Sequence, residues 1–216
     1  MKYDLVIFDL DGTALETIDD IAAALNASLN AKGFPTRTRE QVRKGIGGGV
    51  GNLIRCSVPK DTEEASIQAI IADFKERYAR DIDVQTHPFD GIPALFEAIR
   101  QSGIHLAINS NKIDAAVTCL CQSHFPGLIE YSLGEHPDFP KKPAPDGARH
   151  IMAHMQISPE RTLYVGDGDA DIQTAKNAGI DCAWVAWGYR TREELGNLCP
   201  EHTFDTVKAL QDFILG

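Results

Sequence analysis

The stretch DLVIFDLDGT, residues 4–13, joins a short apolar run to two carboxylates that flank a single leucine. The run from Leu5 to Phe8 has the length and composition of a buried strand. In open α/β sheets ligands bind beyond the carboxyl ends of the strands, so we expect Asp9 and Asp11 to face a crevice. An isolated Asp-Gly pair is usually an ordinary turn, but two carboxylates this close repel each other until a cation or a proton intervenes. The stretch therefore predicts a strand with a functional site at its end.

Three further apolar runs, rich in branched residues, each precede a helical pattern. They cover His105 to Asn109, Thr162 to Gly166 and Asp181 to Ala186. Alternation of this kind predicts an α/β fold with a doubly wound, mostly parallel sheet and helices on both faces.

The segment from residue 14 to residue 83 interrupts this alternation, because its apolar residues recur at helical spacing. Thr17 and Asp20 resemble a capping box and predict a helix start. We therefore expect a helical cap at residues 14–83, inserted after the first strand into an α/β catalytic core of residues 1–13 and 84–216.

The composition favours a folded, acidic protein that acts on a small molecule. Hydrophobic residues make up 43% and charged residues 24% of the chain, which excludes a disordered or fibrous protein. With 21 basic and 31 acidic residues the chain lacks the basic surface that nucleic-acid binding requires, so we expect no nucleic-acid partner. No apolar stretch approaches the roughly 20 residues of a membrane span, so we expect no membrane association.

The cysteines and the N-terminal residues indicate the cellular compartment in which the protein is expected. Five scattered cysteines suit reduced thiols better than a disulfide framework. The first four residues lead directly into an apolar run without a signal-peptide pattern. We therefore expect a cytoplasmic protein, while the oligomeric state has no signal in the sequence.

A second predicted strand end also carries carboxylates, in the segment GDGDAD at residues 166–171. Asp167 can join Asp9 and Asp11 in an oxygen-only site of the kind that Mg²⁺ prefers. Asp171, about one helical turn further on, is expected to orient the cation or its water from behind. The strand-end carboxylates therefore predict a magnesium site.

Two weaker signals lie between the acidic segments. Ser110 follows the strand that ends at Asn109, and Lys142 precedes a Pro-Ala-Pro segment and a helical pattern. Each alone is typical of a loop. Together they supply a hydroxyl and a fixed positive charge for the oxygens that carry negative charge in a phosphoryl-transfer transition state.

These four segments, in this order and spacing, resemble the four motifs of the haloacid dehalogenase superfamily. The motifs are D-x-D-G-T at residues 9–13, a strand-end Ser or Thr at Ser110, Lys before Pro at Lys142, and G-D-x-x-x-D at residues 166–171. The helical insert, with GIGGGV at residues 45–50, is similar to the small cap of the phosphoglycolate phosphatase-like branch.

The chain departs from the family pattern at two positions near these motifs. Glu16 stands where members commonly carry Asp, and Gly168 stands where Ser is frequent. Neither departure touches the nucleophile or metal positions.

The resemblance implies a Mg²⁺-dependent phosphatase that hydrolyses a small organic phosphomonoester through an aspartyl-phosphate intermediate. Asp9 would be the nucleophile, and Asp11 would protonate the leaving alkoxide and later take a proton from the attacking water. Ser110 and Lys142 would stabilise negative charge in the transition state. Mg²⁺ would be held by Asp9, Asp167 and the backbone carbonyl of Asp11.

The substrate contacts are expected at Thr13, Asn111 and Arg43. Arg43 precedes a glycine-rich segment, residues 45–51, which lacks the G-K-[ST] ending of a nucleotide phosphate loop and is expected to be a mobile cap loop. Because cap loops select the substrate, the sequence does not identify the phosphomonoester.

Two alternatives stay open. A phosphomutase similar to β-phosphoglucomutase would use the same four motifs and return the phosphoryl group to a sugar. A signalling receiver domain also clusters Asp, Ser or Thr and Lys, but receivers carry no large insert after the first strand. Haloacid dehalogenases lack the second carboxylate, which is Asp11 here, and phosphonatases replace it with a small residue.

Overall fold

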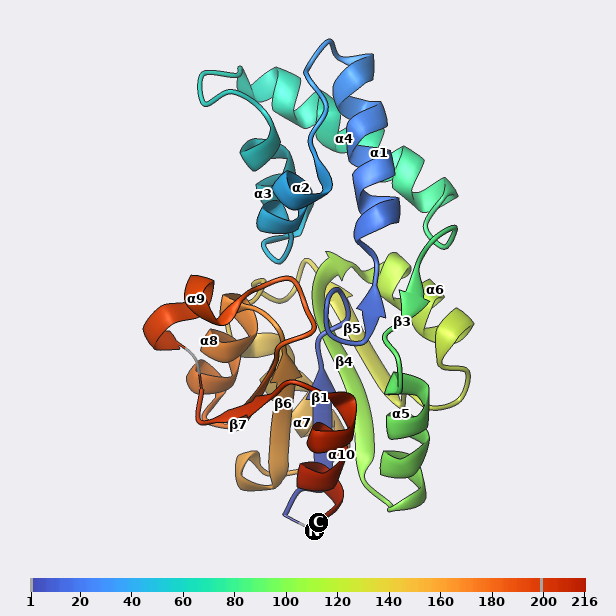
Figure 1. Ribbon diagram of the computed structural model, residues 1–216, viewed down its shortest axis with the longest axis vertical. Helices are drawn as coiled ribbons and strands as arrows, with labels where there is room; N and C mark the ends of the chain where they lie inside the picture. Colours follow the sequence, from blue (N-terminus) through green and yellow to red (C-terminus); the bar gives the residue numbers. More distant parts are fainter. Residues whose placement is uncertain (1, 199) are drawn as a thin grey trace.

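The computed structural model describes residues 2–198 and 200–216 and contains a six-stranded parallel sheet in the order β5-β4-β1-β6-β7-β8 (Figure 1). This confirms the expected parallel α/β fold. The two outer strands β5 and β8 were not expected from the sequence, because neither is an uninterrupted apolar run. The bounds are β1 Leu5–Phe8, β4 His105–Ile113, β5 Tyr131–Glu135, β6 Thr162–Gly166, β7 Asp181–Val185 and β8 His202–Phe204.

The position of β1 explains why its sequence is apolar throughout. The strand lies between β4 and β6, and all four of its residues are buried. Val6 and Phe8 pack on one face of the sheet, whereas Leu5 and Ile7 pack on the other. Because β4 and β6 flank β1 and run parallel to it, the carboxyl ends of the three strands lie side by side. Open sheets bind ligands at such a position, where the strand order reverses.

Helices cover both faces of the sheet, as expected for a doubly wound fold. Helices α5, α6 and α10 supply buried side chains to the core on one face, and α7 and α8 supply them on the other. The short helix α9 precedes the last strand. The bounds are α5 Ile92–Gln101, α6 Asp114–His124, α7 Asp146–Met155, α8 Asp169–Ala178, α9 Arg192–Leu195 and α10 Val207–Leu215.

Four helices between β2 and β3 pack around a second hydrophobic core, which also includes Ala116 and Tyr189, above the carboxyl end of the sheet (Figure 1). We call this unit the cap. Its helices are α1 Ile18–Ala31, α2 Arg39–Gly45, α3 Gly49–Ser57 and α4 Glu64–Arg80. The two connections to the sheet pair with each other as the antiparallel strands β2 Leu15–Glu16 and β3 His87–Pro88, so the range 14–83 is not helical throughout. No helix in the described part of the chain is long and apolar enough to cross a membrane.

The capping box expected at the start of α1 is absent. Thr17 is the N-cap residue, but its hydroxyl caps no backbone N–H and instead donates to Asp11 at 2.7 Å. Asp20 accepts hydrogen bonds from the backbone N–H groups of Val84, Gln85 and Thr86, at 2.8–3.1 Å. Asp20 therefore does not cap its own helix. It binds the start of α1 to residues 84–86, where the chain returns from the cap to the sheet.

This role of Asp20 predicts a loss of stability when its charge is removed. In Asp20→Asn the amide places an N–H group against backbone donors, so the free energy of unfolding should fall by about 2 kcal/mol in urea denaturation. The control is Asp61→Asn, because Asp61 is exposed.

The pH dependence of stability gives a second comparison of the wild type with Asp20→Asn. Burial opposes the charged form of Asp20, but the hydrogen bonds from Gln85 and Thr86 outweigh it and lower the pKa of the carboxyl below its ordinary 3.8. Its contribution is therefore present above about pH 4 and is lost as pH falls below it. A difference between wild type and Asp20→Asn that persists unchanged at lower pH would contradict this assignment.

Candidate active site

The carboxyl ends of β1, β4 and β6 place five polar side chains around one point. Asp9 directly follows β1, Ser110 lies in the last part of β4, and Asp167 directly follows β6. Lys142 comes from the segment before α7, and Asp171 from the first turn of α8. Each of the five is less than a tenth exposed. The sequence placed β4 only to Asn109, but the strand continues to Ile113 with an irregular register against β5, and this carries Ser110 to the site.

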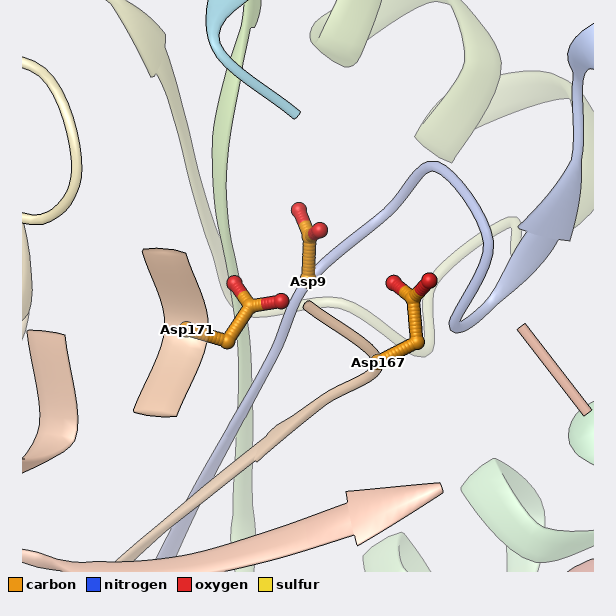
Figure 2. A group of neighbouring side chains, drawn as sticks. All are labelled: Asp9, Asp167 and Asp171. Carbon is orange, nitrogen blue, oxygen red and sulfur yellow. The ribbon is translucent and has the colours of Figure 1, made fainter. Parts of the chain in front are cut away.

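Three carboxylates form a compact acidic cluster, shown in Figure 2. One oxygen each from Asp9, Asp167 and Asp171 lies within 4.8 Å of the other two. Burial raises the pKa of Asp9 well above its ordinary value, and the charge of Asp171 adds to the effect, whereas Lys142 opposes it. Hard oxygen ligands brought together at the cost of mutual repulsion fit a divalent cation.

Asp167 is held in this cluster by two donors. The Thr13 hydroxyl donates to one oxygen at 3.1 Å, and the backbone N–H of Tyr189 donates to the other at 2.6 Å. Gly12 takes a left-handed conformation with φ of 85°, and a Cβ atom there would lie 2.8 Å from an Asp167 oxygen. Burial, together with the charge of Asp171, raises the pKa of Asp167 to about 7.

Lys142 is the cation that balances this cluster. Its Nζ lies 2.8 Å from Asp9 Oδ1 and 2.6 Å from Asp171 Oδ1. Burial opposes its charge, but the charges of Asp171 and Asp9 raise the pKa of Lys142 well above its ordinary value. The other oxygen of Asp171 accepts from the Gly168 backbone N–H at 3.0 Å. Asp171 was expected behind the cation site, and the structure places it within the acidic cluster itself.

The side chain of Asp11 points away from the acidic cluster toward the cap. Its Oδ1 accepts from the Lys112 ammonium at 2.8 Å and from the Thr17 hydroxyl at 2.7 Å. Lys112, two residues after Ser110, was not expected at the site. A lysine is seldom fully buried without a charged partner. Its place at the end of an apolar strand could therefore have indicated a buried ion pair at the site.

The three expected substrate contacts all have partners within the protein. Thr13 donates to Asp167, and Asn111 donates to the carbonyls of Gly47 at 2.8 Å and Lys142 at 3.0 Å. Asn111 thereby joins the cap to the segment that carries Lys142. Substrate contact by Thr13 and Asn111 stays a prediction.

Arg43 lies in a contact between the cap and the core. Its guanidinium pairs with Glu40 and Glu194, each at 2.7 Å, and also donates to the Tyr189 carbonyl. Arg190 donates in the opposite direction, to the carbonyl of Arg43 at 3.0 Å. These contacts fix the cap against the segment after β7, and a substrate contact by Arg43 stays a prediction.

A cavity of about 50 Å³ lies between the acidic cluster and the cap. Its core side is polar, and its cap side is apolar apart from one tyrosine hydroxyl. The core supplies Asp9, Asp11, Ser110, Asn111, Lys112, Ile113 and Lys142, and the cap supplies Ile21, Ile46, Gly47, Gly49, Val50, Leu53, Phe74 and Tyr78. The site therefore has a charged floor and an apolar roof that belong to two parts of the chain.

Known proteins are similar to this chain over nearly its whole length. The family described as haloacid dehalogenase-like hydrolase matches residues 6–185. Phosphoglycolate phosphatase of Aquifex aeolicus (strain VF5) is 32% identical over 216 residues, with 98% of both chains covered. Phosphoglycolate phosphatase of Vibrio vulnificus (strain YJ016) is 32% identical over 223 residues, with 98% of this chain and 96% of the relative covered. The crystal structure of a provisionally assigned phosphoglycolate phosphatase from Lactobacillus delbrueckii subsp. bulgaricus matches 100% of both chains at 32% identity, with a TM-score of 0.94.

The pKa of Asp167 predicts how a cation should stabilise the fold. Without a cation, folded Asp167 holds a proton up to about pH 7, whereas its ordinary pKa is 3.8. The folded state then binds more protons between these values, so stability falls as pH rises from about 4 to about 7. A divalent cation displaces the proton, and its stabilising effect should be larger at about pH 8 than at about pH 5.5.

Thermal unfolding with Mg²⁺ or with EDTA, at both pH values, measures this difference. Asp167→Asn should abolish the shift, whereas Asp169→Asn, an exposed carboxylate in the first turn of α8, should retain it. An equal Mg²⁺ effect at the two pH values in the wild type would show that Asp167 does not hold the cation.

Proposed function

Because this chain belongs to the haloacid dehalogenase-like hydrolase family, we propose that it hydrolyses a small phosphoglycolate-like phosphomonoester by way of a phosphoryl group carried on Asp9. The family membership confirms the resemblance drawn from the four motifs. The observation that carries the proposal is the position of Asp9: its carboxylate is buried at the end of β1, in the acidic cluster and in contact with Lys142.

The first step requires one anion to attack another. Two unit charges about 4 Å apart repel by roughly 4 kcal/mol at an effective dielectric constant near 20. Lys142 places its positive charge 2.8 Å from Asp9 Oδ1, and the Leu10 backbone N–H donates to the same oxygen at 2.7 Å. In the described part of the chain no hydrogen bond reaches Oδ2, and we assign that oxygen to the attack on phosphorus.

A cation would complete the charge balance at this site. The donor set fits Mg²⁺, which would be held by the side chains of Asp9 and Asp167 and by the backbone carbonyl of Asp11, with Asp171 beside them. When bound, it would offset the repulsion between carboxylate and phosphate and polarise the phosphoryl oxygens.

Asp11 and Ser110 act on the two sides of the transferring group. Asp11, which must begin protonated, gives its proton to the leaving alkoxide and later takes one from the water that attacks the phosphorylated Asp9. Lys112 and Thr17 hold its side chain at the wall of the cavity. The Ser110 hydroxyl also lines the cavity, and it donates to a phosphoryl oxygen as negative charge develops there.

Two observations support a small substrate. The cavity is small, about 50 Å³, which favours a short leaving group over a large one. The relatives from Aquifex aeolicus and Vibrio vulnificus, both named phosphoglycolate phosphatase, are similar to the chain over nearly its whole length, cap included. Because the cap forms the roof of the cavity, similarity that extends through it supports a similar leaving group.

A phosphate-release screen tests the proposal. Substrates should include phosphoglycolate, other small phosphomonoesters, pyrophosphate and nucleotides, each with Mg²⁺ and with EDTA. We expect Mg²⁺-dependent release that is highest for a small monoester. Asp9→Asn should lower turnover by a factor on the order of 10⁴ or more, since it removes the nucleophile. Asp169→Asn is the matched control and should keep wild-type activity.

Other outcomes separate the alternatives. Transfer of the phosphoryl group between positions of a sugar, without free phosphate, would identify a mutase. A phosphorylated protein that persists for minutes without turnover would identify a receiver. Wild-type turnover by Asp9→Asn would refute the assigned nucleophile.

A further inference from the structure

The Tyr78 hydroxyl is buried, and no hydrogen bond of standard geometry satisfies it in the described part of the chain. Tyr78 is 2% exposed and lines the cavity from the cap helix α4. The Lys112 ammonium approaches the hydroxyl oxygen, and no acceptor for its O–H lies among residues 2–198 and 200–216. Phe74 stacks on its ring at 5.4 Å between centroids and fixes its orientation. A phenylalanine would fill the same space without this cost, so the orphaned hydroxyl indicates a ligand atom.

Lys112 of the core lies against the Tyr78 ring of the cap, and both line the cavity. Its side chain is 5% exposed, and its Nζ lies 4.7 Å from the centre of the Tyr78 ring. An ammonium has three N–H donors. In the part of the chain that the structure describes, Nζ donates to Asp11 at 2.8 Å and also approaches the Tyr78 hydroxyl oxygen. Lys112 therefore retains one donor for a further acceptor beside the hydroxyl of Tyr78.

We propose that Lys112 Nζ and Tyr78 Oη form a subsite for a carboxylate on the leaving group of the substrate. The inference rests on the proposed phosphatase activity and deepens it by naming the two residues that would recognise the carboxylate of a phosphorylated short hydroxy acid. Asp11 lies between this subsite and Asp9, so the alkoxide that it protonates would join the phosphoryl group to the carboxylate-bearing carbon.

The chemistry of the subsite favours a carboxylate over other groups. A planar carboxylate has two oxygens, one for the ammonium and one for the phenolic O–H. A second phosphate would be larger and more highly charged, and beside Lys112 it would lie close to the Asp11 carboxylate, which repels it. A neutral hydroxyl would leave the Lys112 charge without a second partner in an apolar surrounding that includes Leu53 and Ile113.

The subsite also couples recognition to the cap. Lys112 belongs to β4 of the core, and Tyr78 belongs to α4 of the cap. A carboxylate can bind both only when the cap lies over the sheet as it does in this structure. The leaving group would therefore help to hold the cap over the cavity, which excludes water from the reacting atoms.

Two matched substrates and two matched variants test the proposal. Phosphoglycolate is compared with 2-hydroxyethyl phosphate, which replaces the carboxylate by a neutral hydroxymethyl group. Lys112→Met keeps the length of the side chain without its charge, and Tyr78→Phe removes only the hydroxyl. Lys44→Met is the control for loss of a positive charge, because Lys44 is an exposed lysine of the cap.

The expected result is a change in discrimination between the substrates. In Lys112→Met the ratio of kcat/KM for phosphoglycolate to that for 2-hydroxyethyl phosphate should fall about 30-fold, mainly through KM, and in Tyr78→Phe about 5-fold. Lys44→Met should keep the wild-type ratio. An equal fall on both substrates in Lys112→Met would mean that the lysine acts only through Asp11, and the subsite would be refuted while the phosphatase stands.

A binding measurement separates failure of the subsite from failure of the proposed function. Phosphoglycolate should raise the Tm of the inactive Asp9→Asn protein in the presence of Mg²⁺. The shift should be lost when Lys112→Met is added, and 2-hydroxyethyl phosphate should give a smaller shift that does not depend on Lys112. If the wild type hydrolyses no monoester, a Lys112-dependent shift still supports the subsite, and its absence refutes both.

Discussion

Buried negative charge at the end of β1 is the constraint on which the site depends. Asp9, Asp167 and Asp171 come from three segments, yet one oxygen of each lies within 4.8 Å of the others. Lys142 is the buried cation that contacts two of them, and each of its ion pairs is almost wholly shielded from water. Such a group of charges is stable only while its members stay together, since removal of one partner leaves the others unpaired. The packing of α7 and α8 on the sheet is therefore coupled to the electrostatics of the site.

The two departures from the family pattern also have places in this network. Glu16 accepts from the Tyr189 hydroxyl at 3.1 Å and pairs with Arg39 at 3.3 Å, so its longer side chain reaches both a core residue and a cap residue at the connection between them. Gly168 uses its backbone N–H to bind Asp171. A serine hydroxyl at this position is not needed for the contact, because the carboxylate of Asp171 accepts directly from the main chain.

The sequence predicted those features that depend on chain order. Strand-end residues such as Asp9 and Asp167 could be placed together because parallel strands end at the same edge of a sheet. Features that depend on contacts between distant segments could not be predicted. Asp20 looked like a local helix cap, but its carboxylate binds backbone 64 to 66 residues away. Tyr78 continues the helical spacing of the buried residues in α4. The sequence pattern is the same whether or not its hydroxyl contacts a ligand.

The cap is inserted directly after the loop that carries Asp11. Asp11 therefore lies at the boundary between the core side and the cap side of the cavity. Asn111 extends the connection, because one side chain donates to the cap carbonyl of Gly47 and also bonds both backbone groups of Lys142. Displacement of the cap would therefore act on the segment that balances the charge of Asp9. The core alone holds the groups proposed for phosphoryl transfer, and the cap above them would exclude water from the reacting atoms.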